Sequence, residues 1–366
     1  MSDKVLQVNK YYSPDIGGVE TVVKQYSEFL HENKFEVCIL CVNKDFTLKT
    51  KIEVIDGINV VRCASLGTYF SMPISFIFYY YYIKLALRSS LIHFHEPFPL
   101  ASVTSLFSLI GLFRKKKIIV TWHSDIIKQK ILKGFVEFFQ SLLLRRADVI
   151  TTTSPNMIKF SKLLQDYSYK VKVLPLSIEV KDTITEDDSY ILYLGRLSYY
   201  KGIDILLKAY DKSVTSLKLV IVGDGESSIV DLVNEYREQF PDKIIFKNFF
   251  VTEEEKWEMI KNCSFFVFPS VQPSEAFGII QLEAMICSKP VINTNLPTGV
   301  PFVSLDKITG ITVEPNNVDE LSKAIDKLSF DIDYRIKLGN NACERVKTVF
   351  SDHIVLDSLL KIYNNK

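Results

Sequence analysis

The sequence predicts an α/β protein built from two doubly wound parallel sheets. Short β-rich runs alternate with helix-period segments along the whole chain of 366 residues. This alternation is typical of parallel strands with helices on both faces of the sheet. The pattern restarts after a polar patch at Glu179–Ser189. The length also exceeds what one ordinary hydrophobic core requires and fits two domains.

Local composition places the elements in order. In the first half, strands are expected at Val5–Val8, Val37–Val42, Val60–Arg62, Leu91–Phe94, Ile118–Thr121, Val149–Thr152 and Lys172–Leu174, with helices that include Thr21–Glu32 and Gly134–Arg145. In the second half, strands are expected at Tyr190–Leu194, Lys218–Val222, Ile244–Asn248, Phe265–Phe268, Pro290–Asn293 and Ile311–Val313, with a final helix from about His353 to Tyr363. Two such domains facing each other would place the main site in the cleft between them, at the carboxyl ends of strands.

Charge and cysteine usage narrow the class of protein. The formal net charge is +1, whereas nucleic-acid-binding proteins usually carry a basic surplus, so no nucleic-acid partner is expected. Six cysteines, at positions 38, 41, 63, 263, 287 and 343, are scattered along the chain. They indicate buried free thiols in a reducing cytoplasm rather than a disulfide framework. Met1–Lys4 leads directly into a strand, so no signal peptide is expected.

One aromatic stretch, Tyr69–Leu87, resembles a membrane span in length. Pro73 and Lys84 interrupt it, and its mixture of aromatic and polar residues does not suit the centre of a bilayer. We expect a partly buried helix and treat the aromatic run as a candidate contact with a membrane surface. The basic cluster Arg114–Lys117 is a second candidate, although an ordinary solvated turn before a strand explains it equally well.

The strongest local feature is Pro269–Met285, which follows an apolar strand and becomes helical in its second half. The backbone amides of Ala276–Ile279 are therefore expected to be unpaired donors at a helix amino terminus, which suit phosphate or hydroxyl oxygens. Glu275 and Glu283 flank this terminus. At about 1.5 Å per residue they could reach two parts of a ligand roughly 10 Å apart. A capping carboxylate and a solvated helix glutamate would explain the same spacing.

Two cations follow the first strand of the second half. In Tyr193–Gly202 the strand ends in glycine, and Arg196 and Lys201 stand on the connection to the next helix. Arginine offers a fork of donors and lysine a point charge, a combination that suits a diphosphate. Cations on loops are usually plain surface residues, but a position at the carboxyl end of a strand favours binding.

Strand ends in the first half carry further candidates. Gly17 and Gly18 follow the first strand, where they permit close approach of a ligand or form a tight turn. His123 follows another strand and is a candidate hydrogen-bonding residue, although isolated histidines are more often structural. His93 and His95 share one strand face but lack a third ligand, so no metal site is expected there.

A nicotinamide-dependent oxidoreductase is a rival hypothesis because glycines at 223 and 225 follow a strand. The third glycine position of the dinucleotide fingerprint holds Ser228 instead. The motif also lies in the second half rather than after the first strand of the chain. It is therefore weak evidence for such an enzyme.

Taken together, these segments resemble the retaining glycosyltransferases of family 4, whose GT-B fold has two Rossmann-like domains. The resemblance covers essentially the whole chain and is most specific at Glu275–Glu283, which matches the family's Glu-x7-Glu motif. The Gly17–Gly18 loop, the stretch from Arg196 to Gly202 and the glycines at 223 and 225 occur in the family's order. The chain departs from the family pattern at Ser177, where glycine is common.

The resemblance implies a domain organisation. It implies an acceptor-binding domain at 1–180, a nucleotide-sugar-binding domain at 186–350, and a last helix at 351–366 that packs back on the first domain. The base-reading loop would fall at Asn248–Thr252, which offers no clear code for uracil or guanine. No metal or other cofactor is expected, because family members do not need an Asp-x-Asp site. Asp331–Asp333 matches this motif but is expected to be ordinary exposed surface.

The resemblance also implies residue roles. Arg196 and Lys201 would hold the donor diphosphate and stabilise the departing nucleotide. Glu283 would bind the ribose hydroxyls, and Glu275 would lie against the transferred sugar. The remaining residues implied to border the donor or the sugar are Gly17, Gly18, His123, Ala276, Phe277, Gly278 and Ile279.

Two further segments, His93–Pro99 and Trp122–Lys130, are similar to those of bacterial mannosyl- and rhamnosyltransferases of surface polysaccharide assembly. This similarity implies transfer of a hexose, with mannose favoured, from a GDP- or UDP-sugar to a lipid-linked oligosaccharide in O-antigen, capsule or lipopolysaccharide synthesis. The protein would then work in the cytoplasm, at the cytoplasmic face of the inner membrane. The alternative is a non-catalytic nucleotide-binding partner in a polysaccharide assembly complex. The presence of Glu275, Glu283 and both cations disfavours it.

Overall fold

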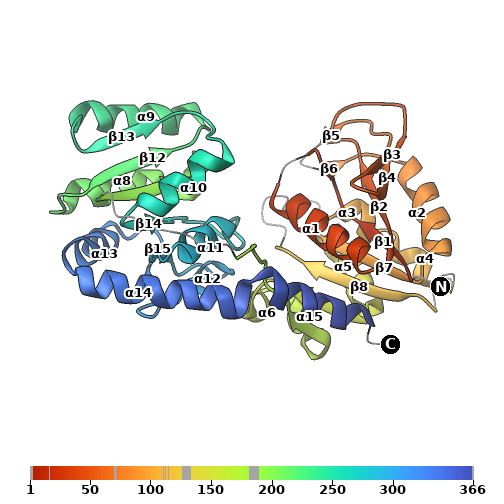
Figure 1. Ribbon diagram of the computed structural model, residues 1–366. Helices are drawn as coiled ribbons and strands as arrows, with labels where there is room; N and C mark the ends of the chain where they lie inside the picture. Colours follow the sequence, from red (N-terminus) through yellow and green to blue (C-terminus); the bar gives the residue numbers. More distant parts are fainter. Residues whose placement is uncertain are drawn as a thin grey trace. The chain divides into compact units, whose positions relative to one another are not determined.

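The computed structural model describes residues 3–15, 17–69, 72–109, 111, 113, 115–125, 133–180 and 189–364. The chain divides into two compact units, Met1–Leu174 with Leu356–Lys366, and Pro175–Val355. The boundary proposed from the sequence, between 180 and 186, runs into residues 181–188, which lie outside the described residues. The last helix, α15 (Asp352–Asn364), begins in the second unit and ends in the first (Figure 1).

In the first unit, the described residues form an eight-stranded sheet with the order β10-β9-β8-β7-β1-β2-β4-β3 (Figure 1). The strands are β1 (Lys4–Val8), β2 (Glu36–Val42), β3 (Lys51–Ile55), β4 (Ile58–Cys63), β7 (Leu91–Glu96), β8 (Lys117–Trp122), β9 (Val149–Thr152) and β10 (Val171–Val173). The helices are α1 (Gly18–Glu32), α2 (Ile77–Arg88), α3 (Pro99–Ser102), α4 (Ser105–Leu109), α5 (Lys133–Arg146), α6 (Pro155–Phe160) and α7 (Lys162–Gln165), with a short 3-10 turn η1 (Ser168–Lys170). The strand order reverses between the parallel neighbours β1 and β7, and at such a point the carboxyl ends of strands form a binding crevice.

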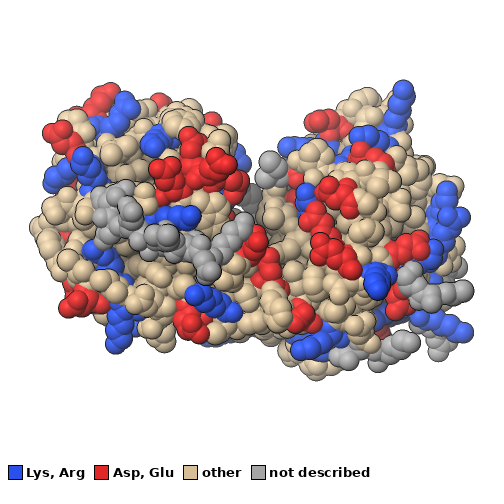
Figure 2. All heavy atoms as spheres, viewed as in Figure 1, with Lys and Arg blue, Asp and Glu red and all other residues tan. Residues whose placement is uncertain are grey.

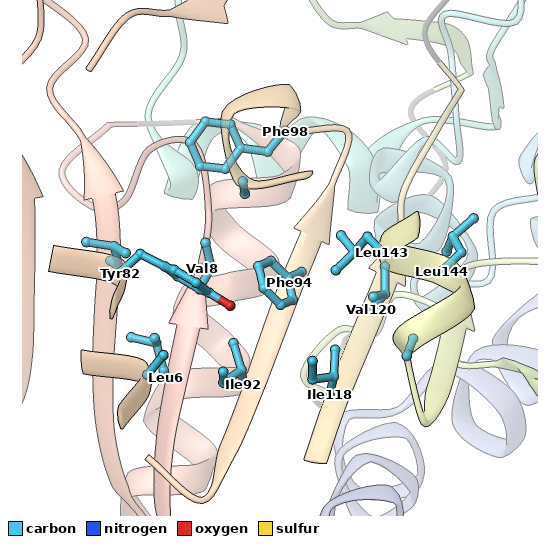
Figure 3. Packing of buried hydrophobic residues seen from close by; sticks show 14 of the residues in the cluster. Leu6, Val8, Tyr82, Ile92, Phe94, Phe98, Ile118, Val120, Leu143 and Leu144 are labelled. Atoms are coloured by element: carbon cyan, nitrogen blue, oxygen red, sulfur yellow. The ribbon is translucent and has the colours of Figure 1, made fainter. Parts of the chain in front are cut away.

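The alternation of side chains along β7 gives the two faces of this sheet different characters. Ile92 and Phe94 point to one face and join a buried apolar cluster (Figure 3). Neighbouring strands and helices contribute Leu6, Val8, Tyr82, Phe98, Ile118, Val120, Leu143 and Leu144 to it. His93 and His95 alternate with Ile92 and Phe94 along the strand and therefore point to the opposite face. That face is buried as well, since both histidines are at most 1% exposed.

Strand β3 was not predicted from the sequence. It pairs antiparallel with β4 through the two-residue turn Asp56–Gly57, whose φ values are both positive, +50° and +79°. An Asp-Gly pair with positive φ at both residues is a strong hairpin signal. It was missed because β3 is an edge strand whose lysine and glutamate side chains obscure the β pattern.

The aromatic stretch Tyr69–Leu87 is helical only in its second half. The two-stranded ribbon of β5 (Thr68–Tyr69) and β6 (Met72–Pro73) precedes α2, which starts at Ile77. Over the described ranges, no helix combines the length and apolar character that crossing a membrane requires.

The second unit contains, among its described residues, a six-stranded parallel sheet with the order β13-β12-β11-β14-β15-β16. Its strands are β11 (Tyr190–Leu194), β12 (Lys218–Val222), β13 (Ile244–Lys247), β14 (Phe265–Val267), β15 (Val291–Thr294) and β16 (Gly310–Val313), each within one residue of the predicted bounds. Its helices are α8 (Ile203–Lys212), α9 (Ser227–Gln239), α10 (Glu253–Asn262), α11 (Ile279–Ile286), α12 (Val300–Val303), α13 (Val318–Phe330) and α14 (Ile332–Arg345), with single turns η2 (Tyr199–Lys201) and η3 (Val346–Phe350). Counted from β11, this is the order 3-2-1-4-5-6 of the Rossmann fold, so the predicted α/β fold class is confirmed.

The glycines at 223 and 225 serve close packing between backbones. A Cβ atom on Gly225 would lie 1.9 Å from the carbonyl oxygen of Leu197, and one on Gly223 would lie 2.0 Å from that of Gly195. Gly225 also forms a parallel β-bridge with Leu197. The loop after β12 therefore lies directly against the backbone that leaves β11, and this packing explains both glycines without a dinucleotide.

Gly225→Ala is expected to lower the midpoint of thermal unfolding, because displacing packed backbone costs about 1–3 kcal/mol. Gly134→Ala is the matched control, since no atom lies within 4 Å of a Cβ there. As that position is helical, alanine should stabilise it by at most about 1 kcal/mol. Circular dichroism melts of the three proteins check this, and equal melting of wild type and Gly225→Ala would contradict it.

Candidate functional site

A charged pair lies at the carboxyl edge of the six-stranded sheet, where the strand order reverses. Lys201 follows β11, and Glu275 follows its neighbour β14. Lys201 Nζ lies 2.5 Å from Glu275 Oε2, and Ser270 Oγ donates to the same oxygen at 3.3 Å. The two charged side chains are only 14% and 11% exposed. The structure thus brings together two of the residues predicted to bind the donor and adds Ser270, which the sequence analysis did not single out.

Local backbone geometry holds Lys201 in this position. Gly202 has a φ of +70°, and a Cβ on it would lie 2.1 Å from the carbonyl oxygen of Pro269. The amide of Val271 also donates to the carbonyl of Tyr200 at 2.8 Å. The turn after β11 therefore packs on the segment after β14, and the Lys201 ammonium lies 5.2 Å from the centre of the Phe268 ring. A side chain larger than glycine at position 202 would push the two segments apart.

Arg196 differs from Lys201 in being exposed. Its carbonyl accepts a hydrogen bond from the Tyr193 hydroxyl at 3.1 Å, which fixes the backbone just after β11. Its guanidinium has no ion-pair partner within the described part of the chain. The strand end thus carries one enclosed, paired cation and one that is available to an anion.

The helix amino terminus lies slightly later than the sequence predicted. Gly278, with a φ of +79°, caps α11, and the amide of Gln281 donates to the Gly278 carbonyl. The amides of the first helical turn, Ile279 and Ile280, have no acceptor within the helix. Ala276 and Phe277 precede the helix because the left-handed conformation at Gly278 interrupts it. The spacing of 1.5 Å per residue therefore does not apply along the whole segment from Glu275 to Glu283, and the separation of roughly 10 Å stays a prediction.

Ala276 and Phe277 have structural contacts of their own. The Ala276 carbonyl accepts from the amide of Gly299 at 2.8 Å. Phe277 is 3% exposed, and its ring centre lies 6.1 Å from that of Phe350 in an edge-on arrangement. Among the described residues these contacts tie the segment before α11 to α12 and to the turn η3.

Glu283 forms a second ion pair, which the sequence analysis missed. Its Oε1 accepts from Lys256 Nζ of α10 at 2.8 Å, and both side chains are 14% exposed. Burial raises the pKa of Glu283, and the neighbouring ammonium opposes this shift. A capping box between Thr252 and Glu255 starts α10, so the sequence carried a signal for this helix. Thr252, expected in a base-reading loop, is this helix cap.

The surface around α10 is acidic. Its first turn contains Glu253, Glu254 and Glu255, and Figure 2 shows acidic side chains gathered over this part of the unit. Lys256 also pairs with Glu253, at 2.8 Å. The ammonium of Lys256 is therefore held between an exposed carboxylate and the enclosed carboxylate of Glu283.

In the first unit, a buried arginine holds the loop that follows β1. Arg62 of β4 is 6% exposed and donates to the carbonyl oxygens of Tyr12 at 3.1 Å and Ser13 at 2.7 Å. It also pairs with Asp15 at 3.2 Å and Glu53 at 3.3 Å. This arginine was predicted only as the end of a strand. No local motif marked it, because its partners lie far away in sequence.

Gly17 and Gly18 lie at the end of this loop and begin α1. Gly17 is the cap residue in an extended conformation, and Thr21 Oγ1 donates to its carbonyl at 3.0 Å. A Cβ on Gly18 would meet no atom within 4 Å. Packing within the described protein therefore does not require glycine at position 18, and the space beside it is open to a ligand.

His123, directly after β8, is linked to a buried network on the polar face of the sheet. Its Nε2 lies 3.1 Å from His95 Nδ1, and His95 Nε2 lies 2.9 Å from Gln7 Oε1. Gln7 Nε2 donates to the Tyr363 hydroxyl at 3.0 Å, and that hydroxyl lies 2.6 Å from His93 Nδ1. Burial lowers the pKa of His123 to about 4 and that of His93 to about 3, and it holds the pKa of His95 well below its ordinary value. All three rings are therefore neutral at physiological pH.

Near this network, Glu96 at the end of β7 is fully buried and accepts three hydrogen bonds. They come from the amide of Phe98 at 2.9 Å, Ser102 Oγ at 2.8 Å and Gln140 Nε2 at 2.9 Å. Burial raises the pKa of Glu96 to about 7, and these donors oppose the shift. Glu96 thereby ties the end of β7 to α3 and α5.

The residues considered as metal ligands have other partners. Asp331 accepts from the amide of Tyr334 at 3.0 Å and pairs with Lys327 at 2.7 Å, so it caps α14. Both ring nitrogens of His93 are hydrogen-bonded, the second one to Thr121 at 2.6 Å. Across the described ranges, no three His, Cys, Asp or Glu side chains are grouped as a metal site would require. All six cysteines are free.

Two family models match consecutive parts of the chain. The model described as "Glycosyltransferase Family 4" matches residues 16–181, and the model described as "Glycosyl transferases group 1" matches residues 177–345. The chain is 28% identical to the O-antigen chain mannosyltransferase C of Escherichia coli, over 98% of each chain. It is 28% identical to the D-rhamnosyltransferase WbpZ of Pseudomonas aeruginosa, over 93% of this chain and 90% of that one. Among solved structures, Anabaena HepE in complex with UDP has the same fold, with a TM-score of 0.78 and 16% identity over 99% of this chain and 100% of that one.

The buried histidines are expected to stay neutral well below their ordinary pKa, because burial disfavours the charged imidazolium. In NMR titrations, the ring resonances of His93, His95 and His123 should not shift between pH 8 and pH 5. The chain has five histidines, so His31→Gln and His353→Gln identify the two signals outside the network. A titration of His123 with a midpoint near its ordinary 6.5 would contradict the buried, neutral state.

Proposed function

We propose a specific reaction for this chain, which belongs to the family 4 glycosyltransferases and shares their GT-B fold of two Rossmann-like domains. In this proposal the protein transfers a hexose, with mannose favoured, from a GDP- or UDP-sugar to a lipid-linked oligosaccharide of bacterial O-antigen, capsule or lipopolysaccharide. The transfer retains the anomeric configuration and needs no metal ion. The proposal draws on the two curated relatives, which act on mannose and rhamnose by name and align along nearly the whole chain.

The observation that carries the donor site is the enclosed Lys201–Glu275 pair at the strand reversal of the second unit. Enclosed ion pairs are costly to maintain, and stability alone gives little reason to keep one. A diphosphate beside Lys201 would lie next to a positive charge that the protein holds in a fixed position. Arg196, which follows the same strand, adds a fork of donors for the second phosphate.

This arrangement suits the chemistry of the leaving group. As the bond between sugar and nucleotide breaks, negative charge develops on the diphosphate. Cations and helix-end amides that are already oriented stabilise this charge without reorganisation. In this chain those groups are Arg196, Lys201 and the first amides of α11. They stand in for the charge that a divalent metal supplies in metal-dependent enzymes.

Glu283 is suited to the ribose of the donor. The Oε1 atom of Glu283 accepts a hydrogen bond from Lys256, whereas its Oε2 atom has no hydrogen-bond partner within the described part of the chain. A carboxylate oxygen at this position accepts a hydrogen bond from a ribose hydroxyl. The Lys256 ammonium favours the ionised carboxylate, because it opposes the effect of burial, which raises the pKa of Glu283.

In the first unit, His123 and the Gly17–Gly18 turn are assigned to the sugar and the acceptor. Both lie at the carboxyl edge of the sheet, after β8 and β1. Open space beside Gly18 permits close approach of a ligand to the backbone. His123 is neutral and serves as a hydrogen-bonding group rather than as a charge.

A lipid-linked acceptor requires access to a membrane surface, and α2 has the side chains for it. Phe76, at its amino-terminal cap, and Tyr80 are 75% and 57% exposed, and Leu87 is 51% exposed. Lys84 and Arg88 are exposed at the same helical spacing as Phe76 and Tyr80. Aromatic and basic side chains on one face suit an interface with anionic lipid headgroups.

The basic cluster Arg114–Lys117 contributes less than the sequence suggested. Lys116 Nζ donates to the carbonyl oxygens of Leu87 and Ser89, and Lys117 Nζ donates to those of Ile362 and Tyr363. Arg114 lies outside the described residues. Two of the four cations are therefore engaged in hydrogen bonds within the first unit.

Transfer assays with GDP- and UDP-sugars, a synthetic lipid-diphosphate acceptor and EDTA test the reaction. Lys201→Ala is expected to lower kcat about a hundredfold, equivalent to roughly 3 kcal/mol of transition-state stabilisation, and Glu275→Ala should also abolish most turnover. Lys208→Ala is the control, since Lys208 is an exposed lysine that pairs with Asp204 on α8. Wild-type turnover that disappears with EDTA would overturn the metal-free reaction. Equal turnover of Lys201→Ala and Lys208→Ala would overturn the role of Lys201.

Sedimentation with anionic phosphatidylglycerol vesicles tests the membrane contact. Binding is expected at low salt and should weaken at high salt, because basic side chains near the surface contribute about 1 kcal/mol each. The double variant Phe76→Ser, Tyr80→Ser should bind several-fold more weakly. Tyr169→Ser is the control, as Tyr169 is 81% exposed but lies outside α2. Vesicle binding equal in both variants would exclude α2 as the contact.

A further inference from the structure

A chain of buried hydrogen bonds on the polar face of the first unit ends at His123. It runs from Gln7 on β1 to His95 on β7 and then to His123 after β8, with heavy-atom distances of 2.9 Å and 3.1 Å. Tyr363 of α15 joins it at Gln7. The elements that supply these side chains are far apart in sequence. Their polar atoms meet because β1, β7 and β8 are neighbours in the sheet.

The orientation of the Gln7 amide gives this chain a direction. Gln7 Nε2 donates to the Tyr363 hydroxyl, so Gln7 Oε1 is the acceptor that faces His95 Nε2. A neutral imidazole carries one ring proton, which His95 must then place on Nε2. Its Nδ1 is therefore an acceptor, and the proton in the bond to His123 belongs to His123 Nε2. His123 Nδ1 is left with a lone pair.

The other branch of the network is consistent with the same direction. The Tyr363 hydroxyl accepts from Gln7 and donates to His93 Nδ1 at 2.6 Å. His93 then carries its proton on Nε2 and donates to Thr121 Oγ1 at 2.6 Å. Lys117 Nζ donates to the carbonyl oxygen of Tyr363 at 3.2 Å, which fixes the end of α15 on β8. The last helix of the chain thereby helps to hold the Gln7 amide in one orientation.

His123 Nδ1 is the ring nitrogen of this network that lacks a partner within the described part of the chain. The residue is only 5% exposed. This nitrogen is not one of the fully enclosed polar atoms that lack a partner, so its lone pair stays accessible at the carboxyl edge of the sheet, where a ligand can donate a hydrogen bond to it. In a sugar, that donor is a hydroxyl group.

We propose that Gln7, His95 and Tyr363 are positioning residues that fix the Nε2–H tautomer of His123, so that Nδ1 accepts a hydrogen bond from a hydroxyl of the transferred sugar. The ligand in this inference rests on the proposed function, whereas the tautomer does not. If the Gln7 amide were turned over, each hydrogen bond in the chain would reverse. His123 would then present Nδ1–H and select an acceptor atom instead.

The tautomer is measured on the ligand-free protein. Long-range proton–nitrogen NMR correlations of the full chain labelled with ¹⁵N-histidine distinguish protonated from unprotonated ring nitrogens at pH 7. The expected result is protonation at Nε2 and a free Nδ1 in His93, His95 and His123. A proton on His123 Nδ1 would overturn the proposal, whatever the activity of the protein.

Two variants are designed to free His123 from the single tautomer that this network imposes, and a third variant serves as a matched control. Gln7→Met removes the acceptor for His95, and Tyr363→Phe removes the group that orients the Gln7 amide. Each should give mixed tautomers at His123, and the second keeps the test open if the first does not fold. Tyr26→Phe is the control, because its ring lies beside His93 and His95 while its buried hydroxyl has no hydrogen-bond partner among the described residues. Its tautomers should match the wild type.

Transfer kinetics then test the role of the lone pair. Gln7→Met should lower kcat/KM about three- to tenfold, the size of one neutral hydrogen bond. It should cause no further loss when His123 is already alanine, because it acts through that side chain. Unchanged kcat/KM in Gln7→Met with an altered tautomer would overturn the role in sugar binding. If the wild type transfers no sugar at all, the proposed function fails, and the role of His123 in sugar binding fails with it. The NMR result still decides whether the network fixes the tautomer of His123.

Discussion

The interaction on which the second unit's site depends is the enclosed ion pair between Lys201 and Glu275. Removing two charges from water is costly, and the cost is recovered only when the geometry is good and further hydrogen bonds complete the pair. Ser270 supplies such a bond, and close packing at Gly202 holds the two segments in register. The two strands that carry these segments, β11 and β14, are those between which the strand order reverses. Sheet topology, backbone packing and charge thus converge on one edge.

The first unit meets a similar constraint without charge. One face of its sheet is a conventional apolar core, whereas the other buries Gln7 and three histidines. Such groups are tolerated only when they are hydrogen-bonded, and a partly satisfied network is less stable than an apolar one. The described network satisfies its members up to His123, where it leaves one acceptor open. A buried network that is complete except at the carboxyl edge of the sheet has the form expected of a binding group rather than of a packing defect.

The sequence predicted the sheets of both units well because their strands are short apolar runs bounded by turns. The second unit's strands were placed to within one residue. The edge strand β3 was missed because exposed edges lack that apolar signal. Candidate site residues were predicted where they follow strands, as at Arg196, Lys201, Glu275 and His123, and their binding roles stay predictions. The partners Lys256, Ser270, Gln7 and Tyr363 could not be predicted, since their roles arise from contacts between elements that are distant in sequence.

The difference between the two edges bears on what each unit recognises. Diphosphate groups carry charge at all physiological pH values, and the second unit presents Arg196 and Lys201 at its strand ends. Sugar hydroxyls carry no charge, and the first unit presents a neutral histidine whose pKa burial lowers to about 4. A cation there would be costly to bury beside two further imidazoles, and it would gain little from a hydroxyl. Histidine kept neutral by burial suits a hydroxyl, just as a lysine held in place by a carboxylate suits a phosphate. Under the proposed function, this distribution of charge between the units follows the division of the donor into a nucleotide part and a sugar part.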